Sequence, residues 1–320
     1  MTDYLNTYRR YACDIDRVNE EARRSPNGFV ASAERIFRND LHMIVDQICR
    51  EPVNRHVVLL SGPSSSGKTT TSMRLADEFR NQGFDTKIIS MDNFYLGKDK
   101  VDILPDGKPD FESVNALDIP PIKQCIHQLL TVGECEIPKY DFKHSRPSGE
   151  SFPVKLSKNS AIIMEGIHAL NPIFSEGVSD SGVTKIYVSV KQGIKDNEEY
   201  VLTNRDIRFI RRLVRDYSFR KVDPQYMLSM WDTVVDGEKK YIRPFRYKSD
   251  FTVNSLLIYE PCVMKKTAMS LFERIPADDP GRVFIDRLYA ALERFEEIDP
   301  ELVPTNSLLR EFIGGGCYSY

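Results

Sequence analysis

The stretch from residue 56 to residue 71 has the residue types and the spacing of a phosphate-binding loop. It reads His-Val-Val-Leu-Leu-Ser-Gly-Pro-Ser-Ser-Ser-Gly-Lys-Thr-Thr-Thr, and residues 62–69 fit the pattern G-x-x-x-x-G-K-[ST]. The two glycines let successive backbone N–H groups face a phosphate, and a helix that begins near Lys68 adds its positive N-terminal end. The predicted cofactor-binding residues are Gly62, Pro63, Ser64, Ser65, Ser66, Gly67, Lys68, Thr69 and Thr70.

Two side chains of this loop have separate predicted tasks. The Lys68 amine is expected to reach the β- and γ-phosphates as a point charge, and the Thr69 hydroxyl is expected to bind Mg²⁺. The alternative is a glycine-rich turn without a ligand. The flanks favour phosphate binding, because an apolar run at 57–60 precedes the loop and apolar residues at helical spacing follow it.

A carboxylate follows the second predicted strand. Residues 86–91 read Thr-Lys-Ile-Ile-Ser-Met, and Asp92 comes next. The carboxyl ends of parallel strands face the crevice in which open α/β sheets bind their ligands. We therefore expect Asp92 to lie at the same site as the phosphate loop.

Residues 206–216 form an arginine-rich segment with helical spacing. They carry Arg208, Arg211, Arg212 and Arg215. A guanidinium group binds phosphate oxygens through two parallel hydrogen bonds and keeps its charge, so this helix is predicted to be a phosphate-facing lid. The alternative is a solvated face on which the charges pair locally.

The remaining pattern alternates strands with helices. Strands are predicted at 57–60, 86–91, 161–164, 184–190 and 250–254, and further helices at 122–130, 259–272 and 283–295. Residues 134–138 and 151–156 are predicted to pair as a small antiparallel hairpin. The alternation implies the α/β class, with a doubly wound parallel sheet flanked by helices.

Helical segments are also predicted at both ends of the chain. A strong turn signal, Ser-Pro-Asn-Gly at 25–28, separates two helical patterns and predicts an N-terminal helical hairpin over 1–52. We expect a P-loop nucleotide domain over 53–260 and a helical C-terminal extension over 261–320.

Two features of these end segments carry no firm function. Tyr4, Tyr8 and Tyr11 line one face of the first helix, and packing on the core is favoured over a homo-oligomer or partner surface. The Gly-Gly-Gly run at 314–316 is expected to be mobile slack.

Composition excludes several classes of protein. The 320 residues carry a net charge of -3, which gives no broad positive surface for nucleic acid. The six cysteines form no C-x-x-C pair, so they are expected to be reduced thiols rather than zinc ligands. The sequence has no apolar run of about 20 residues and no apolar signal segment, so we expect a cytoplasmic protein without membrane contact.

Four further segments give the chain a more specific resemblance. They are Ile-Ser-Met-Asp-Asn-Phe-Tyr at 89–95, Ile-Pro-Lys-Tyr-Asp-Phe-Lys-His-Ser-Arg at 137–146, Glu-Gly-Ile at 165–167 and the arginine pattern at 208–216. Together with the loop they resemble the uridine-cytidine kinases, which belong to the uridine kinase and phosphoribulokinase family of P-loop kinases. The resemblance implies transfer of the γ-phosphoryl group of ATP to the 5′-hydroxyl of a nucleoside, with Mg²⁺.

The same resemblance implies roles for individual residues. Asp92 looks like the general base, and Thr69, Asp92 and Glu165 look like the metal site. The implied catalytic set is Asp92, Lys68, Arg208, Arg211 and Arg212, with the three arginines as a closing lid. The implied nucleoside pocket consists of Tyr95, Phe111, Glu112, Tyr140, Phe142, His144 and Arg208.

Two positions depart from the family pattern. Glu112 stands where the family usually has an aspartate, so the ribose contact falls to a longer carboxylate. One residue rather than two separates Phe142 from His144, which affects the base-reading position. Uridine is the expected first substrate and cytidine the next.

Other functions stay open at this point. Phosphoribulokinase-like or pantothenate kinase-like chemistry uses the same scaffold, although the aromatic residues near Tyr140 favour a flat base over a sugar phosphate. A non-catalytic nucleotide-binding protein or switch is a further alternative. A guanine-nucleotide switch is disfavoured, because the sequence lacks the Asn-Lys-x-Asp base reader.

Overall fold

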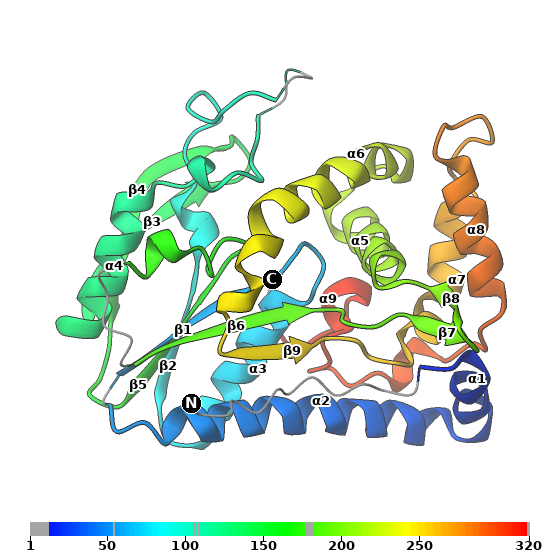
Figure 1. Ribbon diagram of the computed structural model, residues 1–320, viewed down its shortest axis with the longest axis horizontal. Helices are drawn as coiled ribbons and strands as arrows, with labels where there is room; N and C mark the ends of the chain where they lie inside the picture. Colours follow the sequence, from blue (N-terminus) through cyan, green and yellow to red (C-terminus); the bar gives the residue numbers. More distant parts are fainter. Residues whose placement is uncertain (1–12, 54, 105–106, 108, 177–181, 319–320) are drawn as a thin grey trace.

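The computed structural model describes the chain except for residues 1–12, 54, 105–106, 108, 177–181 and 319–320 (Figure 1). The helices are α1 Ile15–Arg24, α2 Pro26–Cys49, α3 Lys68–Asn81, α4 Ile119–Thr131, α5 Asn204–Arg220, α6 Pro224–Gly237, α7 Glu260–Phe272, α8 Arg282–Glu293 and α9 Arg310–Ile313. The strands are β1 Arg55–Ser61, β2 Asp85–Ser90, β3 Glu134–Asp141, β4 Arg146–Lys155, β5 Ser160–Glu165, β6 Val183–Ser189, β7 Ile194–Asp196, β8 Glu199–Leu202 and β9 Phe251–Asn254. Short helical turns are η1 Met91–Phe94, η2 Val114–Ala116, η3 Pro172–Phe174, η4 Glu238–Ile242, η5 Arg243–Lys248 and η6 Pro300–Leu302.

A five-stranded parallel sheet forms the centre of the molecule, in the order β2-β5-β1-β6-β9. Strand β1 lies in the middle. Its Leu60 is paired with Glu165 of β5, and Glu165 is paired in turn with Ser90 of β2. The carboxyl ends of these three strands therefore lie at one level, which brings together the segments that follow β1 and β2.

Both faces of the sheet are covered, which explains the continuous apolar character of its strands. Val57 and Leu59 of β1 belong to a core cluster with Ile122 of α4. Val58 and Leu60 point the other way and belong to a cluster with Leu75 of α3 and with α2. The predicted α/β class with a doubly wound parallel sheet is confirmed.

The turn at Ser25 produces the two N-terminal helices. The Ser25 N–H donates to the Glu21 carbonyl at the end of α1 at 3.1 Å, and its Oγ accepts from the Gly28 N–H at 3.3 Å at the start of α2. Pro26 occupies the first turn of α2, where a missing N–H costs nothing. The predicted tyrosine stripe lies outside the described residues.

The N-terminal and C-terminal segments lie together at one end of the molecule. Figure 1 places α1 beside α7, α8 and the β7–β8 hairpin. Asn19 of α1 donates to the carbonyl of Arg294 at 2.8 Å, and Arg23 pairs with Glu296 at 2.8 Å. One core cluster runs through α1, α2, α3, β1, β6, α5, α7 and α8. The three predicted segments therefore share a core, and their boundaries stay a prediction.

Four parts of the structure differ from the expectations from sequence. The hairpin of β3 and β4 is present and longer than predicted. Helix α6 and the β7–β8 hairpin were not predicted. The C-terminal tail packs on the molecule instead of hanging loose, because Leu308, Leu309 and Phe312 are fully buried. Within the described parts of the chain, no helix is long and apolar enough to cross a membrane.

Candidate active site

The loop between β1 and α3 has the backbone that its glycines predict. Gly67 caps α3 with a φ of +83°, a left-handed conformation that glycine adopts without strain. A Cβ at Gly62 would lie 2.0 Å from the carbonyl oxygen of Val188 in β6, so only glycine fits there. The first N–H groups of α3 follow directly, and they have no partners within their own helix.

Lys68 of the phosphate loop lies within electrostatic range of two carboxylates, Asp92 after β2 and Glu165 at the end of β5. Its Nζ donates to the Pro63 carbonyl at 3.3 Å. Burial lowers the pKa of Lys68, and the charges of Glu165 and Asp92 oppose that shift. The alignment of the strand ends thus assembles one cation and two carboxylates that lie far apart in the sequence.

Asp92 and Glu165 are neighbouring carboxylates, of which Glu165 is buried and Asp92 is half-buried. Burial raises the pKa of Glu165 to about 7, and the neighbouring Asp92 charge adds to the rise while Lys68 opposes it. The pKa of Asp92 is also raised by burial, against the opposing charges of Lys68 and Arg220. The two carboxylates repel each other when both are ionised, and a cation bound to their oxygens would relieve that repulsion.

The donor set fits magnesium. Mg²⁺ in kinase sites is held by one or two carboxylates, by substrate phosphates and by water. Asp92 and Glu165 supply the carboxylates, and Thr69 supplies a hydroxyl from the first turn of α3. Among the described residues no group of three or more His, Cys, Asp or Glu side chains is arranged to hold a metal by itself. The site therefore suits an ion that arrives with a nucleotide.

The arginines predicted as a lid brace the phosphate loop from outside. Arg208 Nε donates to the Ser64 carbonyl at 2.9 Å, and Arg212 Nη1 donates to the Ser64 hydroxyl at 2.7 Å. Arg208 also pairs with the buried Glu238 at 2.6 Å. This position makes Arg208 a support for the loop rather than a mobile clamp.

Arg211 does not fit its predicted lid role. It is fully buried and makes a two-point ion pair with Glu260 of α7 at 2.6 and 2.9 Å. Its remaining hydrogen bonds go to Ser65 and Ser255. A guanidinium whose donors are all engaged inside the protein has none left for a phosphate, so Arg211 joins α5 to α7 and to the loop.

Two arginines that were left out of the predicted catalytic set face the site instead. Arg215 and Arg220 line a cavity of about 520 Å³ together with Thr69. Both pair with the buried Asp216, at 2.8 and 3.5 Å, and Arg212 pairs with the same residue at 3.4 Å. Three guanidinium groups thus share one carboxylate, which leaves an excess of positive charge suited to phosphate.

Aromatic side chains gather beside this site. The ring of Tyr95, after β2, lies 5.9 Å from that of Phe111 and 6.0 Å from that of Tyr140 in β3. Phe142 follows, with its ring 5.1 Å from Tyr140. The Tyr95 hydroxyl donates to the Phe111 carbonyl at 3.2 Å. Four of the residues in the implied nucleoside pocket therefore form one group.

The outer part of that pocket is open. Phe142 is 65% exposed. His144 is also exposed, and its Nδ1 lies 2.6 Å from Asp141 Oδ2 at the turn between β3 and β4. The contact with Asp141 occupies one ring nitrogen of His144, and its exposed position does not support the base-reading role that the resemblance implied.

Glu112 lies on the inner side of the pocket. Burial raises its pKa, and the charges of Arg212 and Lys68 oppose the rise, so this carboxylate stands between the arginine helix and the phosphate loop. His168 and Asp110 are buried nearby, and the Tyr241 hydroxyl donates to Asp110 at 2.8 Å. His168 follows the end of β5, so the strand-end argument that found Asp92 would also have found it.

A glycine loop after the central strand of a parallel sheet, with a lysine, two carboxylates and an arginine helix around it, defines the class of P-loop kinases. The model of the phosphoribulokinase / uridine kinase family matches residues 57–259, and the chain belongs to this family. Membership confirms the resemblance seen in the sequence. It makes the protein a phosphotransferase by family and implies the use of ATP.

The following known proteins are among those similar to this chain. A uridine kinase of Lactobacillus helveticus is 29% identical over 198 residues, which are 62% of this chain and 85% of that protein. A uridine kinase of Deinococcus deserti is 24% identical over 60% of this chain and 80% of that protein. The solved structure of a possible uridine kinase from Bacillus stearothermophilus covers 47% of this chain and 79% of its own, with 21% identity and a TM-score of 0.40.

Proposed function

We propose that this protein transfers the γ-phosphoryl group of ATP to the 5′-hydroxyl of a nucleoside, with uridine as the first substrate and cytidine as the next. The observation that carries the proposal is the aromatic group of Tyr95, Phe111 and Tyr140, in which Tyr95 lies near enough to Asp92 for that carboxylate to raise its pKa. Asp92 in turn acts on Lys68 of the phosphate loop. Aromatic faces suit a planar base. The names of the curated relatives support the same substrate class.

The pocket also offers a contact for ribose. Glu112 is a half-buried carboxylate near Lys68 and Arg212, and such a group is stabilised when it accepts hydrogen bonds from hydroxyls. A ribose bound there brings its 5′ end toward Asp92. Ribonucleosides are therefore favoured over 2′-deoxynucleosides, because the deoxy compound offers Glu112 fewer donors.

The chain's own residues divide the work of the transfer. Asp92, whose pKa is raised by burial, accepts the proton of the attacking hydroxyl. Lys68 and the arginines that share Asp216 stabilise the charge on the transferring group. Arg208 and Arg211 keep the loop in its binding conformation.

Thr69, Asp92 and Glu165 would hold Mg²⁺. When bound, the ion neutralises phosphate charge and helps to orient the nucleotide. Glu165 is buried at this position, and Thr69 and Asp92 are half-buried.

The test is an acceptor panel with ATP and Mg²⁺, scored by acceptor-dependent release of ADP. It includes uridine, cytidine, their 2′-deoxy forms, purine nucleosides, ribulose 5-phosphate and pantothenate. We expect the highest kcat/KM for uridine and a lower value for deoxyuridine. Turnover of ribulose 5-phosphate or pantothenate without turnover of any nucleoside would contradict the proposal.

The ribose contact has its own test. In Glu112→Ala, kcat/KM for uridine should fall by a factor that corresponds to about 1–3 kcal/mol of lost transition-state binding. The ratio of kcat/KM for uridine to kcat/KM for deoxyuridine should move closer to one. Glu136→Ala, at an exposed position of β3, is the matched control. An unchanged ratio in Glu112→Ala would place the ribose elsewhere.

A further inference from the structure

The C-terminal segment, residues 307–318, lies outside the family match at 57–259 but touches the phosphate loop. Leu308 is fully buried. A Cβ at Gly67 would lie 2.6 Å from Leu308 Cδ1, so the leucine packs against the glycine that caps α3. A segment that the family does not define is therefore part of the surroundings of the nucleotide site.

Glu311 of α9 takes the hydrogen-bond donors that the loop should offer to a phosphate. Its Oε2 accepts from the Thr70 N–H at 3.2 Å and from the Thr70 hydroxyl at 2.8 Å. Thr70 belongs to the first turn of α3, where backbone N–H groups lack helical partners and attract anions. The carboxylate also acts electrostatically on Lys68. The Glu311 carboxylate therefore occupies a position at Thr70 where a phosphate group of a nucleotide could bind.

The glycine run of the tail forms one wall of the cavity of about 520 Å³. Thr69 and Arg215 line it at the phosphate loop, and Phe219 and Tyr318 line it as well. The Tyr318 hydroxyl donates to Asp77 of α3 at 2.7 Å. Asp77 lies eight residues after Thr69, or about 12 Å along the helix at 1.5 Å per residue. The cavity thus extends from the phosphate loop to an aromatic end, and its volume is in the range of small-molecule sites.

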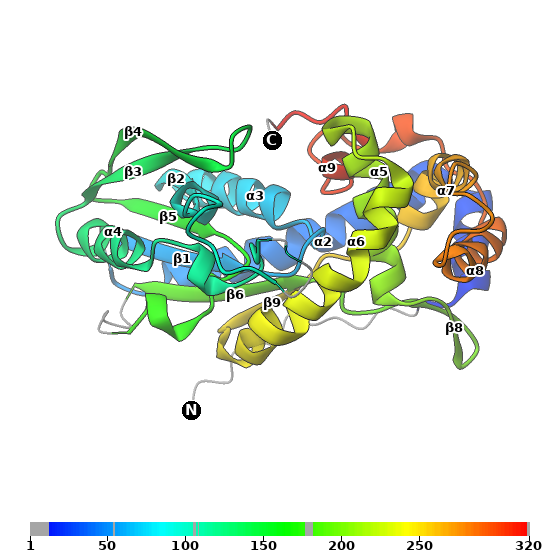
Figure 2. The same cartoon turned by 90° about the horizontal axis from the view of Figure 1, so that it is seen from above.

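The tail is held in place by its own hydrogen bonds. Arg310 Nη1 donates to the Gly314 carbonyl at 3.1 Å, and Arg310 Nε donates to the Val303 carbonyl at 3.2 Å. The Cys317 N–H donates to the Thr305 carbonyl at 2.9 Å. In the ribbon, the red segment that follows α9 runs from α5 toward α3 (Figures 1 and 2). A wall fixed in this way can contribute to binding.

We propose that residues 307–318 complete the donor-nucleotide site of this protein. Tyr318 and the glycine run line the end that receives the nucleobase, and Glu311 occupies a phosphate position at Thr70 until the nucleotide replaces it. The inference rests on the proposed function only in taking a nucleoside triphosphate as the donor. It predicts that Glu311 weakens the binding of any polyphosphate, whereas Tyr318 strengthens only the binding of ligands that carry a base.

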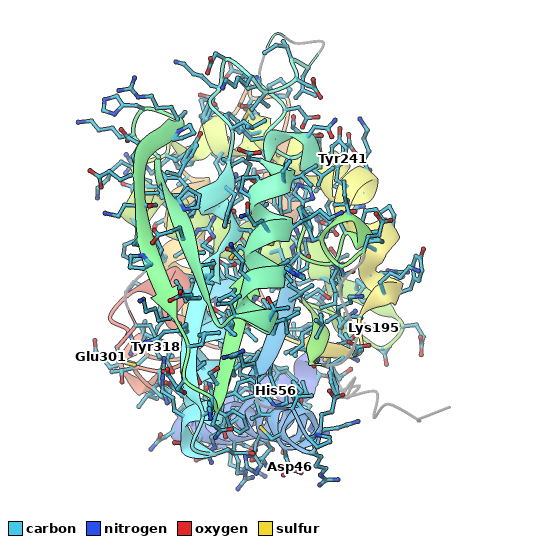
Figure 3. The ribbon with its side chains drawn as sticks, turned by 90° about the vertical axis from the view of Figure 1, so that its left-hand side faces the viewer. Asp46, His56, Lys195, Tyr241, Glu301 and Tyr318 are labelled. Atoms are coloured by element: carbon cyan, nitrogen blue, oxygen red, sulfur yellow. The ribbon has the colours of Figure 1, made fainter. Side chains whose placement is uncertain are left out.

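The first experiment tests Glu311 by calorimetry on the full chain without an acceptor, using a non-hydrolysable ATP analogue and inorganic tripolyphosphate. Glu311→Gln keeps an oxygen acceptor for Thr70 and removes the charge. Both ligands should bind about tenfold more tightly than to the unsubstituted protein. Glu301→Gln is the matched control, because Glu301 is exposed and lies toward the same side of the molecule as Tyr318 (Figure 3). Unchanged affinities in Glu311→Gln would overturn the phosphate position.

The second experiment tests the base end with the same two ligands. Tyr318→Ala should weaken the ATP analogue at least about fivefold and leave tripolyphosphate unchanged, and Tyr318→Phe should keep most of the affinity. Equal effects on both ligands, or no effect, would overturn the placement of the base. Because no acceptor is present, a protein that shows these differences but phosphorylates no nucleoside would refute the proposed function alone.

Discussion

At the scale of single residues, a substitution of Asp92 tests proton transfer separately from ATP binding. We predict that Asp92→Asn lowers kcat for uridine by at least about 10²-fold while ATP still binds, because the amide keeps the shape and loses the proton acceptor. The measurement is kcat at saturating ATP over a series of Mg²⁺ concentrations, with the exposed Asp99→Asn as control. Recovery of kcat at high Mg²⁺ would mean that Asp92 acts only as a metal ligand and that another group accepts the proton.

His168 should make the protein sensitive to acid. Burial lowers the pKa of His168 to about 4, against an ordinary value of 6.5, and the nearby Asp110 opposes this shift. Because the unfolded chain takes up the proton first, the free energy of unfolding falls as the pH drops from about 6.5 to about 4. The full loss is about 3 kcal/mol for this one group.

The check is urea denaturation at pH 6.5, 5.5 and 4.5. His168→Gln should lose less stability over this range than the unsubstituted protein, and the exposed His127→Gln should behave like the unsubstituted protein. Burial also lowers the pKa of His56, so the free energy of unfolding still depends on pH in every variant. An identical slope in His168→Gln would show that this histidine is not a buried neutral group.

At the scale of elements, α5 has two functions along its length. Its first half is fixed, because Arg211 and Glu260 form an ion pair with both side chains fully buried. Arg211→Met leaves the Glu260 carboxylate buried without its partner, and we predict a loss of about 3–5 kcal/mol in the free energy of unfolding. The double variant Arg211→Met/Glu260→Leu should recover most of that loss in the same urea titration. A stable single variant would mean that Arg211 is not needed for the core.

The second half of α5 bears on catalysis. Arg220 is 58% exposed and pairs only at 3.5 Å with Asp216, yet it lines the cavity at Thr69. We predict that Arg220→Ala lowers kcat/KM for ATP by about 10²-fold and changes the free energy of unfolding by less than about 0.5 kcal/mol. Steady-state kinetics give kcat/KM for ATP, and urea denaturation of the same preparation gives the free energy of unfolding. A loss of stability without a loss of turnover would reverse the roles assigned to the two halves.

At the scale of the whole molecule, Glu34 of α2 joins the N-terminal helices, the phosphate-loop helix and the tail. It pairs with Arg74 of α3 at 2.9 Å and accepts from the hydroxyls of Tyr259 and Ser307. Glu34 and Arg74 are both buried. The extensions therefore support the element that carries the phosphate loop.

Removing this carboxylate should destabilise the entire molecule. Glu34→Ala leaves Arg74 charged and unpaired in the interior, and we predict a loss of about 3–5 kcal/mol in the free energy of unfolding. Thermal and urea denaturation measure it, with the exposed Glu20→Ala as control. If Glu34→Ala unfolded like the control, the N-terminal helices would be appended to the kinase fold without supporting it.

Patterns that depend on local spacing were readable from the sequence. The phosphate loop, the five strands of the sheet and the β3–β4 hairpin follow from glycine positions and from apolar periodicity, which act over a few residues. Strand order then brought Asp92 and Glu165 to the loop, since the carboxyl ends of parallel strands lie at one edge.

Only the tertiary structure decided which polar groups face the site. Helical spacing showed that the arginines of α5 lie on neighbouring faces, but the partners of each face come from distant segments. Arg211 is buried in the core, where it pairs with Glu260. Arg215 and Arg220 pair with Asp216 and line the cavity. Glu311 reaches Thr70 from 241 residues away, so no local pattern could place it.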